Sequence, residues 1–479
     1  MPSSSPVNPF TYLQANADSN PNGMFCVSPT ARVSNAEAVI EAKKLAYELR
    51  RLGVRPGHIV ALDLPEPLSI LFTEAVYHEG GISTVLPEGY VADSDFAIDW
   101  IFSNRAPRAQ GAATLVTVDA RFLRQVDQNP YGISPSGEPI ETLRIVFSSG
   151  TTGTPKAIAL GREMERVMDA ALPMMAAAGT ALELMDTGIA GGIGEFFLSV
   201  KAGVPYLTAS GASPAVVVRM ILEHSVRRLG GSPAQVAAVV AELERTDSTA
   251  PSIQSITVGG SHMPPGLAAR AHSVTEGCVV MSNYGSTEAG TAARRMHTSE
   301  DPFDAGQVVP GSTIEIVDAA DTVLPVGEVG RIRHRGYGMA REYLGNAEAT
   351  SRAFRDGWFY PGDLGSLRSD GGLTLAGRES EVLNSGGVKI DPNRIDNLAL
   401  QHPQVIDACS FGYAAESGLR EIGLALVTED GIDIQTLVAD LAAELGNAAP
   451  TLVARVEVIP RTATGKPVRR TLAERYSNY

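Results

Sequence analysis

The chain has 479 residues, more than a single hydrophobic core usually serves, so its length predicts two or three domains. Its composition, with 44% hydrophobic and 19% charged residues, is typical of a globular protein and excludes a fibrous or disordered chain. The net charge of −15 argues against binding to nucleic acid or to anionic membranes, because both require a basic surface.

Cysteine usage and the apolar segments favour an intracellular protein. Cys26, Cys278 and Cys409 are too few and too widely spaced for a disulfide framework or a zinc site. Residues 1–10 lack the basic and apolar parts of a secretory signal. The most apolar window, residues 188–207, contains charged residues and several glycines. We therefore expect a cytoplasmic protein without a membrane span, either a monomer or a homodimer.

Along the first 290 residues, helical and strand patterns alternate. Residues 35–53 place three leucines on one stripe, which predicts a helix with Asn35 as its N-cap and Gly53 at its end. Residues 58–64 indicate a buried strand, and residues 67–81 a second helix. Further short β-branched runs occupy residues 114–119, 142–147, 252–258 and 278–283. This alternation predicts parallel sheets covered by helices.

The pattern changes near Gly311. Residues 312–318 and 327–336 indicate antiparallel strands, which predicts a β-rich subdomain over about residues 311–379. Beyond it, apolar runs at 421–427 and 455–459 flank a helical segment at 434–445. We expect an α/β fold with a large N-terminal domain of stacked, mainly parallel sheets (residues 1–379) and a small α+β domain (residues 380–479).

The stretch FSSGTTGTPKA, residues 147–157, raises the question of function. Gly150 and Gly153 let backbone N–H groups converge, the hydroxyl side chains add donors, and Lys156 adds charge, all of which suit an anion. The stretch does not match the Walker pattern. From these residues alone, a surface turn and an anion-binding loop are equally good interpretations.

Four later stretches, each weak alone, favour the binding loop. They are NYGSTE (283–288), GWFYPGDLG (357–365), GRESEVLNSGGVKI (377–390) and PRTATGKPVRR (460–470). With the loop and in this order, they resemble the adenylate-forming superfamily of acyl-CoA synthetases, adenylation domains and luciferases. The character is closest to acyl-CoA ligases. The resemblance runs from Phe147 to the C-terminus, and the first 140 residues fit only in general pattern.

The resemblance implies an enzyme that activates a carboxylic acid with ATP, releases pyrophosphate, and passes the acyl group of the adenylate to CoA. It implies ATP, Mg²⁺ and CoA as ligands, and a small domain that is mobile between the two steps. An adenylating ligase that uses an amine or a carrier protein as acceptor is the alternative within the enzyme class. A non-catalytic sensor of nucleotide or acyl ligand is the alternative outside it.

The same resemblance implies roles for individual residues. Lys466 stabilises the charge that develops at the α-phosphate, Lys156 the departing pyrophosphate, and Glu288 holds Mg²⁺. Asp363 and Arg378 bind ribose or phosphate, and Tyr284 stacks on adenine. The full set expected at ATP is Ser148, Ser149, Gly150, Thr151, Thr152, Gly153, Thr154, Lys156, Gly260, Ser261, Asn283, Tyr284, Gly285, Ser286, Thr287, Asp363, Arg378 and Lys466.

The remaining expectations concern the acceptor and the acid. Gly386 and Gly387 either let the pantetheine arm of CoA pass or form a plain turn, and Ser380 occupies the hinge, where the family usually has Asp or Lys. The residues expected at the acyl pocket are Gly191, Gly192, Gly259 and Gly285. The glycines at 191 and 192 either make room for a bulky acid or serve tight packing. Glu195 either recognises a polar group on the acid or is paired. The Asp that binds an α-amine is absent, which argues against α-amino acids.

Overall fold

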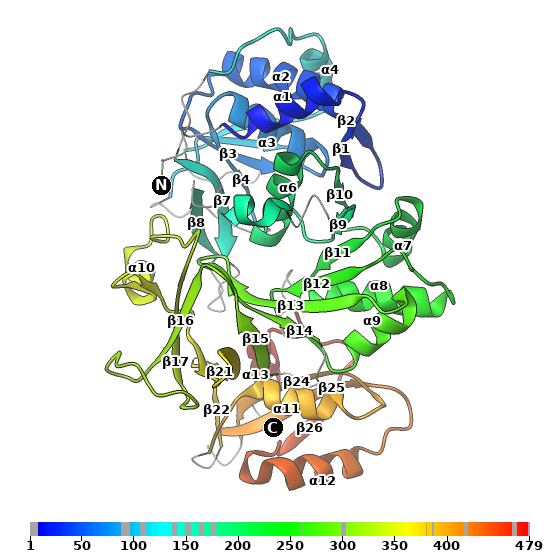
Figure 1. Cartoon of the computed structure of the whole chain (residues 1–479). Helices are drawn as coiled ribbons and strands as arrows, with labels where there is room; N and C mark the ends of the chain where they lie inside the picture. The colour runs from blue at the N-terminus through cyan, green and yellow to red at the C-terminus, as the bar shows by residue number, and fades with distance from the viewer. Residues whose placement is uncertain are drawn as a thin grey trace.

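The structure is a computed structural model, and Figure 1 shows its elements. It describes residues 8–87, 96–105, 112–136, 141–148, 155–161, 167–173, 179–261, 263–297, 303–379, 381–385, 388–415, 420–461 and 467–477. In the view of Figure 1, the N-terminal helices and strands lie at the top and the C-terminal elements at the bottom, with a large sheet between them.

The N-terminal sheet has the order β6-β5-β3-β4-β7-β8, and all its neighbouring pairs are parallel except β7 with β8. Alternate residues enter two different cores: Val60 and Leu62 of β3 pack in one, and Ala61 in the other. Both faces are therefore buried, which explains the near-continuous apolar runs. The strands are β3 (Ile59–Asp63), β4 (Ile82–Val85), β5 (Trp100–Ser103), β6 (Thr114–Thr117), β7 (Thr142–Ser148) and β8 (Lys156–Gly161).

The helices of this region include α1 (Phe10–Ser19), α2 (Asn35–Leu52), α3 (Leu68–His78) and α4 (Ala120–Asp127). The N-cap expected at Asn35 is wrong, because Asn35 is already helical and Ser34 caps α2. The hydroxyl of Ser34 accepts from the Glu37 N–H at 3.3 Å, and the Glu37 carboxylate accepts from the Ser34 N–H at 2.8 Å. This reciprocal capping box fixes the start of the helix. Gly53 ends it as expected, in a left-handed conformation.

The large sheet changes from parallel to antiparallel between β13 and β14 (Figure 1). Its order is β18-β19-β17-β20-β21-β15-β14-β13-β12-β11-β9-β10-β1-β2, with β16 paired to β17. Its strands are β1 (Met24–Val27), β2 (Arg32–Ser34), β9 (Ala181–Glu183), β10 (Tyr206–Thr208), β11 (Arg228–Gly231), β12 (Ser255–Gly259), β13 (Val279–Ser286), β14 (Gly290–Met296), β15 (Asp304–Val308), β16 (Ser312–Val317), β17 (Gly330–Gly336), β18 (Phe354–Arg355), β19 (Trp358–Phe359), β20 (Asp363–Leu367) and β21 (Gly372–Arg378). The antiparallel pairing expected for residues 312–318 and 327–336 is confirmed, because β16 and β17 pair in that way.

Helices accompany the parallel part of this sheet. They are α6 (Ala190–Ala202), α7 (Pro214–Glu223), α8 (Pro233–Arg245) and α9 (Leu267–Thr275), and a further helix, α10 (Ala347–Ala353), follows β17. Helix α8 contacts β11 and β12, and α9 contacts β13, so these two helices pack on the sheet. Helix α6 contacts both α1, a helix of the N-terminal region, and β10 of the large sheet.

The C-terminal elements form their own three-stranded sheet, β24-β25-β26 (Figure 1, bottom). Two hydrophobic clusters drawn only from residues 383–476 hold it together. The elements are β22 (Leu383–Ser385), β23 (Val388–Ile390), α11 (Pro392–Leu400), β24 (Val405–Ala414), β25 (Arg420–Thr428), α12 (Ile434–Leu445), β26 (Leu452–Arg455) and α13 (Arg469–Tyr476). The expected α/β fold, with a small α+β part at the C-terminus, is confirmed. The boundary at residue 380 stays a prediction.

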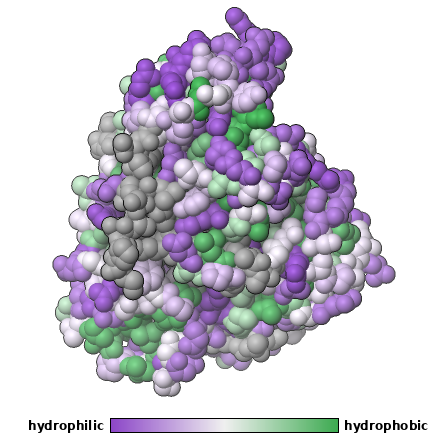
Figure 2. Space-filling model, turned by 45° about the horizontal axis from the view of Figure 1, so that its top comes forward, coloured by the Kyte–Doolittle hydropathy of each residue, from purple (hydrophilic) through white to green (hydrophobic). Residues whose placement is uncertain are grey.

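The face drawn in Figure 2 is mostly hydrophilic, with hydrophobic residues in small groups. Within the described part of the chain, no helix combines the length and the apolar character that a membrane span requires. The apolar window at residues 188–207 supplies α6, which has only 13 residues, and β10.

Candidate active site

A cavity of about 1100 Å³ lies where the N-terminal sheet, α6 and the large sheet meet. Twelve of the residues expected at the active site line it, and nine of these come from four separate motifs. They are Ser148, Lys156, Gly191, Gly259, Gly260, Asn283, Gly285, Ser286, Thr287, Glu288, Asp363 and Arg378. The fold therefore brings the described parts of these motifs to one place.

Other expected residues lie outside the described residues: Ser149, Gly150, Thr151, Thr152, Gly153, Thr154, Ser380, Gly386, Gly387 and Lys466. Ser261, Tyr284 and Gly192 are described but are not among the residues that line the cavity. For Gly192 the acyl-pocket expectation is corrected, because a Cβ there would collide with the backbone of Asp186. Gly192 thus serves tight packing, whereas Gly191 borders the cavity.

Asp363 is the centre of a buried polar cluster that lines the cavity. It stands opposite Arg378 in the pairing of β20 with β21, and its Oδ1 lies 2.9 Å from Arg378 Nε. The hydroxyl of Tyr284 donates to Oδ2 at 2.7 Å. Each carboxylate oxygen has a second lone pair, so Asp363 can still accept a hydrogen bond from a ligand hydroxyl.

The charges of this cluster support one another. Burial acts to lower the pKa of Arg378, but the nearby anionic groups, with Asp363 the strongest, outweigh burial and raise it. Burial raises the pKa of Tyr284, and Asp363 adds to the rise. Arg378 therefore keeps its positive charge at neutral pH, and Tyr284 keeps the hydroxyl proton that it donates. The ring of Tyr284 packs against a hydrophobic cluster that includes Ala292 and Leu373.

Glu288 follows β13 and is 8% exposed at the cavity. The hydroxyl of Tyr343 donates to its Oε1 at 2.7 Å. The Lys156 ammonium lies 4.8 Å from the centre of the Tyr343 ring, within cation–π range. Backbone bonds hold the Tyr343 segment in place, since the Ala340 N–H donates to the Glu288 carbonyl at 2.7 Å. Sequence reasoning missed Tyr343, because no motif contains it and only the fold brings it to Glu288.

Glu195 of α6 and Arg228 of β11 form an ion pair at another wall of the cavity, with 2.7 Å between Oε1 and Nη2. This confirms the paired interpretation of Glu195. Glu183 of β9 lies nearby, and burial raises its pKa to about 8, so its carboxyl is mostly protonated at neutral pH. Its Oε1 accepts from the Met185 N–H at 2.9 Å.

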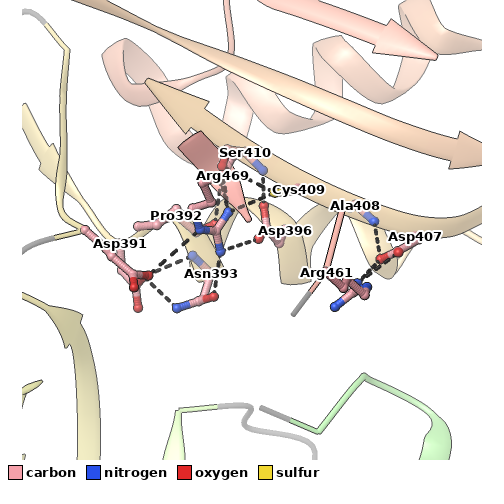
Figure 3. Close-up of polar contacts among 11 residues, drawn as sticks. Asp391, Pro392, Asn393, Asp396, Asp407, Ala408, Cys409, Ser410, Arg461 and Arg469 are labelled. Atoms are coloured by element: carbon pink, nitrogen blue, oxygen red, sulfur yellow. Dashed lines mark hydrogen bonds and ion pairs between the residues drawn. The ribbon is translucent and has the colours of Figure 1, made fainter. Parts of the chain in front are cut away.

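The residues on either side of the segment that contains Lys466 are held in place, although residues 462–466 themselves are not described. Arg461 and Pro467 pair as an antiparallel bridge, and the Val468 N–H donates to the Pro460 carbonyl at 2.7 Å. Arg461 Nη2 donates to both carboxylate oxygens of Asp407, at 2.6 and 2.9 Å (Figure 3).

Arg469, just beyond this segment, is held by hydrogen bonds to several residues of the C-terminal elements. Its guanidinium points toward Asn393, Asp396 and Ser410 (Figure 3), with a distance of 2.7 Å to Asp396 Oδ2. Asp396 is buried, which raises its pKa, while Arg469 opposes that rise. Two arginine–aspartate pairs therefore hold the two ends of the segment to α11 and β24, and Lys466 lies between them in sequence.

Residues 13–344 match the family described as AMP-binding enzyme. The chain belongs to this family. It is similar to a feruloyl-CoA synthase from Amycolatopsis, with 27% identity over 92% of this chain and 93% of the relative. It is also similar to 4-coumarate–CoA ligase 4 of Arabidopsis thaliana, with 23% identity over 98% and 92%. Among solved structures, the o-succinylbenzoate CoA synthetase MenE of Bacillus subtilis superposes with a TM-score of 0.83, 21% identity, and coverage of 96% and 97%.

The family match confirms the resemblance to the adenylate-forming superfamily that the sequence motifs indicated. This AMP-binding enzyme is a member of the adenylate-forming superfamily and a ligase of the AMP-forming acyl-CoA synthetase type. Its motifs therefore belong to an ATP-dependent adenylating enzyme, and not to a Walker-type nucleotide-binding protein.

Proposed function

We propose that this ligase activates a carboxylic acid with ATP to an acyl-adenylate, releases pyrophosphate, and transfers the acyl group to CoA. The observation that carries the proposal is the convergence of Lys156, Glu288, Asp363 and Arg378 on one cavity. A family member that had become a sensor would have no need to keep all four groups, so their retention supports catalysis.

In this proposal Asp363 accepts from the ribose hydroxyls, and Arg378 donates to ribose or phosphate. The 2.9 Å contact between Arg378 and Asp363 supports these roles, because it orients both groups before ATP binds. Ser286 and Thr287 contact the α-phosphate, and Gly259, Gly260 and Asn283 flank adenine. The hydrogen bond from Tyr284 to Asp363 assigns Tyr284 a positioning role in addition to any contact of its ring with adenine.

Lys156 and residues 148–154 hold the β- and γ-phosphates and steady the departing pyrophosphate. The donor set at Glu288 fits Mg²⁺, which prefers one or two carboxylates together with phosphate oxygens and water. Oε1 of Glu288 accepts from Tyr343, and Oε2 has no hydrogen bond from the described residues, so one oxygen is free for the ion. When bound, Mg²⁺ supplies charge neutralisation at the phosphates.

Lys466 carries the first half-reaction, because a positioned ammonium stabilises the charge that accumulates on the α-phosphate oxygens. The carboxylate of the acid is already ionised at neutral pH, so this step needs no general base. In the sequence, Gly386 and Gly387 follow β22 and precede β23, and in the second step they let the pantetheine arm of CoA pass close to the backbone. Ser380 is the hinge between the two arrangements.

The test measures pyrophosphate release from Mg-ATP with a panel of carboxylic acids, with and without CoA. We expect acid-dependent release in both conditions and a thioester only when CoA is present. Acid-dependent release without a thioester would point to an amine or a carrier protein as acceptor. The absence of release with every acid, in a protein that still binds ATP, would contradict the proposed activity and support a sensor.

A further inference from the structure

One wall of the cavity is a face of the large sheet on which polar side chains stand in rows across neighbouring strands. In the first row, Gly259, Asn283 and Arg294 are cross-strand partners on β12, β13 and β14. The next two rows contain Glu183, Gly230, Thr257 and Met281, and then Ala181, Arg228 and Ser255. All these residues line the cavity. Successive rows are two residues, or about 7 Å, apart along the strands.

Arg294 differs from the other charged residues of these rows because it lacks an anionic partner within the described part of the chain. Its Nε donates to Asn283 Oδ1 at 2.8 Å. A guanidinium carries five N–H donors, and the described residues accept from only this one. Burial lowers the pKa of Arg294, yet an arginine stays cationic at neutral pH. The two terminal nitrogens are thus available to a ligand in the cavity.

The remaining charges of the rows cancel. Glu195 neutralises Arg228 at 2.7 Å. Glu183, with a pKa of about 8, is mostly neutral at pH 7 and acts as a hydrogen-bonding group. Across these rows the net charge is therefore the single positive charge of Arg294. A partly buried charge without a counter-ion is unfavourable, so a ligand that brings a negative charge to Arg294 gains affinity.

We propose that the acid activated by this enzyme carries a second carboxylate and that Arg294 binds it. This inference rests on the proposed function, because Arg294 lines the same cavity and stands in one row with Gly259, a residue expected at the acyl pocket. Arginine suits the role, since its fork donates two parallel hydrogen bonds to a carboxylate. The row of Arg294 is about 7 Å along β13 from Gly285, which also lines the cavity and is expected at the acyl pocket.

The test uses aliphatic and aromatic dicarboxylic acids of increasing length, each paired with its monomethyl ester, in the pyrophosphate-release assay. For wild type we expect at least one diacid to have a kcat/KM about 10- to 100-fold above that of its ester, which is the range of a charge-assisted hydrogen bond. Arg294→Gln should remove this preference by lowering kcat/KM for the diacid alone. Arg294→Lys, which keeps the charge, should retain part of it. Arg219→Gln, an exposed arginine of α7, is the matched control.

The outcomes separate this inference from the activity itself. Release with monocarboxylic acids and none with any diacid would overturn the inference and leave the proposed function intact. An equal loss for diacid and ester in Arg294→Gln would also overturn it, because Arg294 would then serve the reacting carboxylate or the phosphates. Silence with all acids would overturn both. Binding of ATP to each variant, measured by calorimetry, shows that a lost preference does not come from misfolding.

Discussion

Tyr343 donates its hydroxyl hydrogen to Oε1 of Glu288 at 2.7 Å, so one oxygen of the expected Mg²⁺ ligand is already occupied in the free protein. The same ring lies beneath the ammonium of Lys156, at 4.8 Å. One aromatic side chain therefore orients both the residue expected to hold the ion and the residue expected to hold the leaving group. Neither contact follows from the motifs.

Replacing Tyr343 with Phe should separate these two contacts. The ring beneath Lys156 stays, and the hydrogen bond to Glu288 is lost, so we expect the KM for Mg-ATP to rise about fivefold, in line with a net hydrogen-bond energy near 1 kcal/mol. Tyr343→Leu removes both contacts and should cost more. Steady-state kinetics at varied Mg²⁺ concentration measures this, with the exposed Tyr337→Phe as control. Equal kinetics for Tyr343→Phe and wild type would show that the hydrogen bond from Tyr343 to Glu288 does not contribute to the binding of Mg-ATP.

Tyr284 can be tested for its two possible contributions. If its hydroxyl matters because it holds Asp363, Tyr284→Phe should weaken ATP binding about fivefold. If its ring stacks on adenine, Tyr284→Phe should bind ATP like wild type and Tyr284→Leu should not. Calorimetric titration with ATP distinguishes the two patterns.

Lys466→Ala should slow adenylation by at least ~100-fold, because the loss of one preorganised donor typically costs about 2.7–4 kcal/mol of barrier. ATP binding should stay nearly intact. Thioester formation from a supplied acyl-adenylate should also be preserved, since the lysine is expected to act only in the first step. Normal pyrophosphate release from the variant would contradict the role of Lys466 in adenylation.

The ion pair between Arg461, just before the Lys466 segment, and Asp407 gives a related prediction. Asp407→Asn removes the charge that holds Arg461, so the segment should be positioned less well and adenylation should slow about tenfold. Thioester formation from supplied acyl-adenylate should not change, whereas a general destabilisation of the C-terminal elements would impair both steps. The control is Asp430→Asn, which breaks the exposed pair with Arg455 in the same part of the chain.

Stability should depend on pH through Glu74. This carboxyl is buried in α3 and its Oε2 lacks a hydrogen-bond partner among the described residues, so burial raises its pKa to about 8. Between about pH 4.5 and 8 the folded chain keeps a proton that the unfolded chain releases. The free energy of unfolding should therefore fall as pH rises through this window, by up to about 1.4 kcal/mol per pH unit.

Equilibrium denaturation at several pH values checks this. Glu74→Gln should reduce the slope, leaving the contribution of Glu183, whereas the exposed Glu457→Gln should not change it. A Glu74→Gln variant that retains the full slope would assign the effect to other groups.

Local patterns were enough to predict the alternating strands and helices and the antiparallel pairing of β16 with β17. Even the error at Asn35 was avoidable, because Ser34 and Glu37 have the spacing of a capping box. The contacts of Tyr343 and Arg294 were beyond reach, since each depends on how separate segments pack. Gly191 and Gly192 show the same limit: the rotation of α6 decides which glycine meets the cavity, and periodicity does not fix that rotation within one residue.

The hairpin of β13 and β14 has a consequence for how this site changes between enzymes. Its turn carries Thr287 and Glu288, which are expected to act on the nucleotide, and β14 carries Arg294, which lines the cavity and is proposed to bind the acid. Under these assignments, the groups that act on every substrate and the group that selects the acid lie only a few residues apart. Substitutions at Arg294 should then change the choice of acid while the turn, and with it the reaction, stays the same.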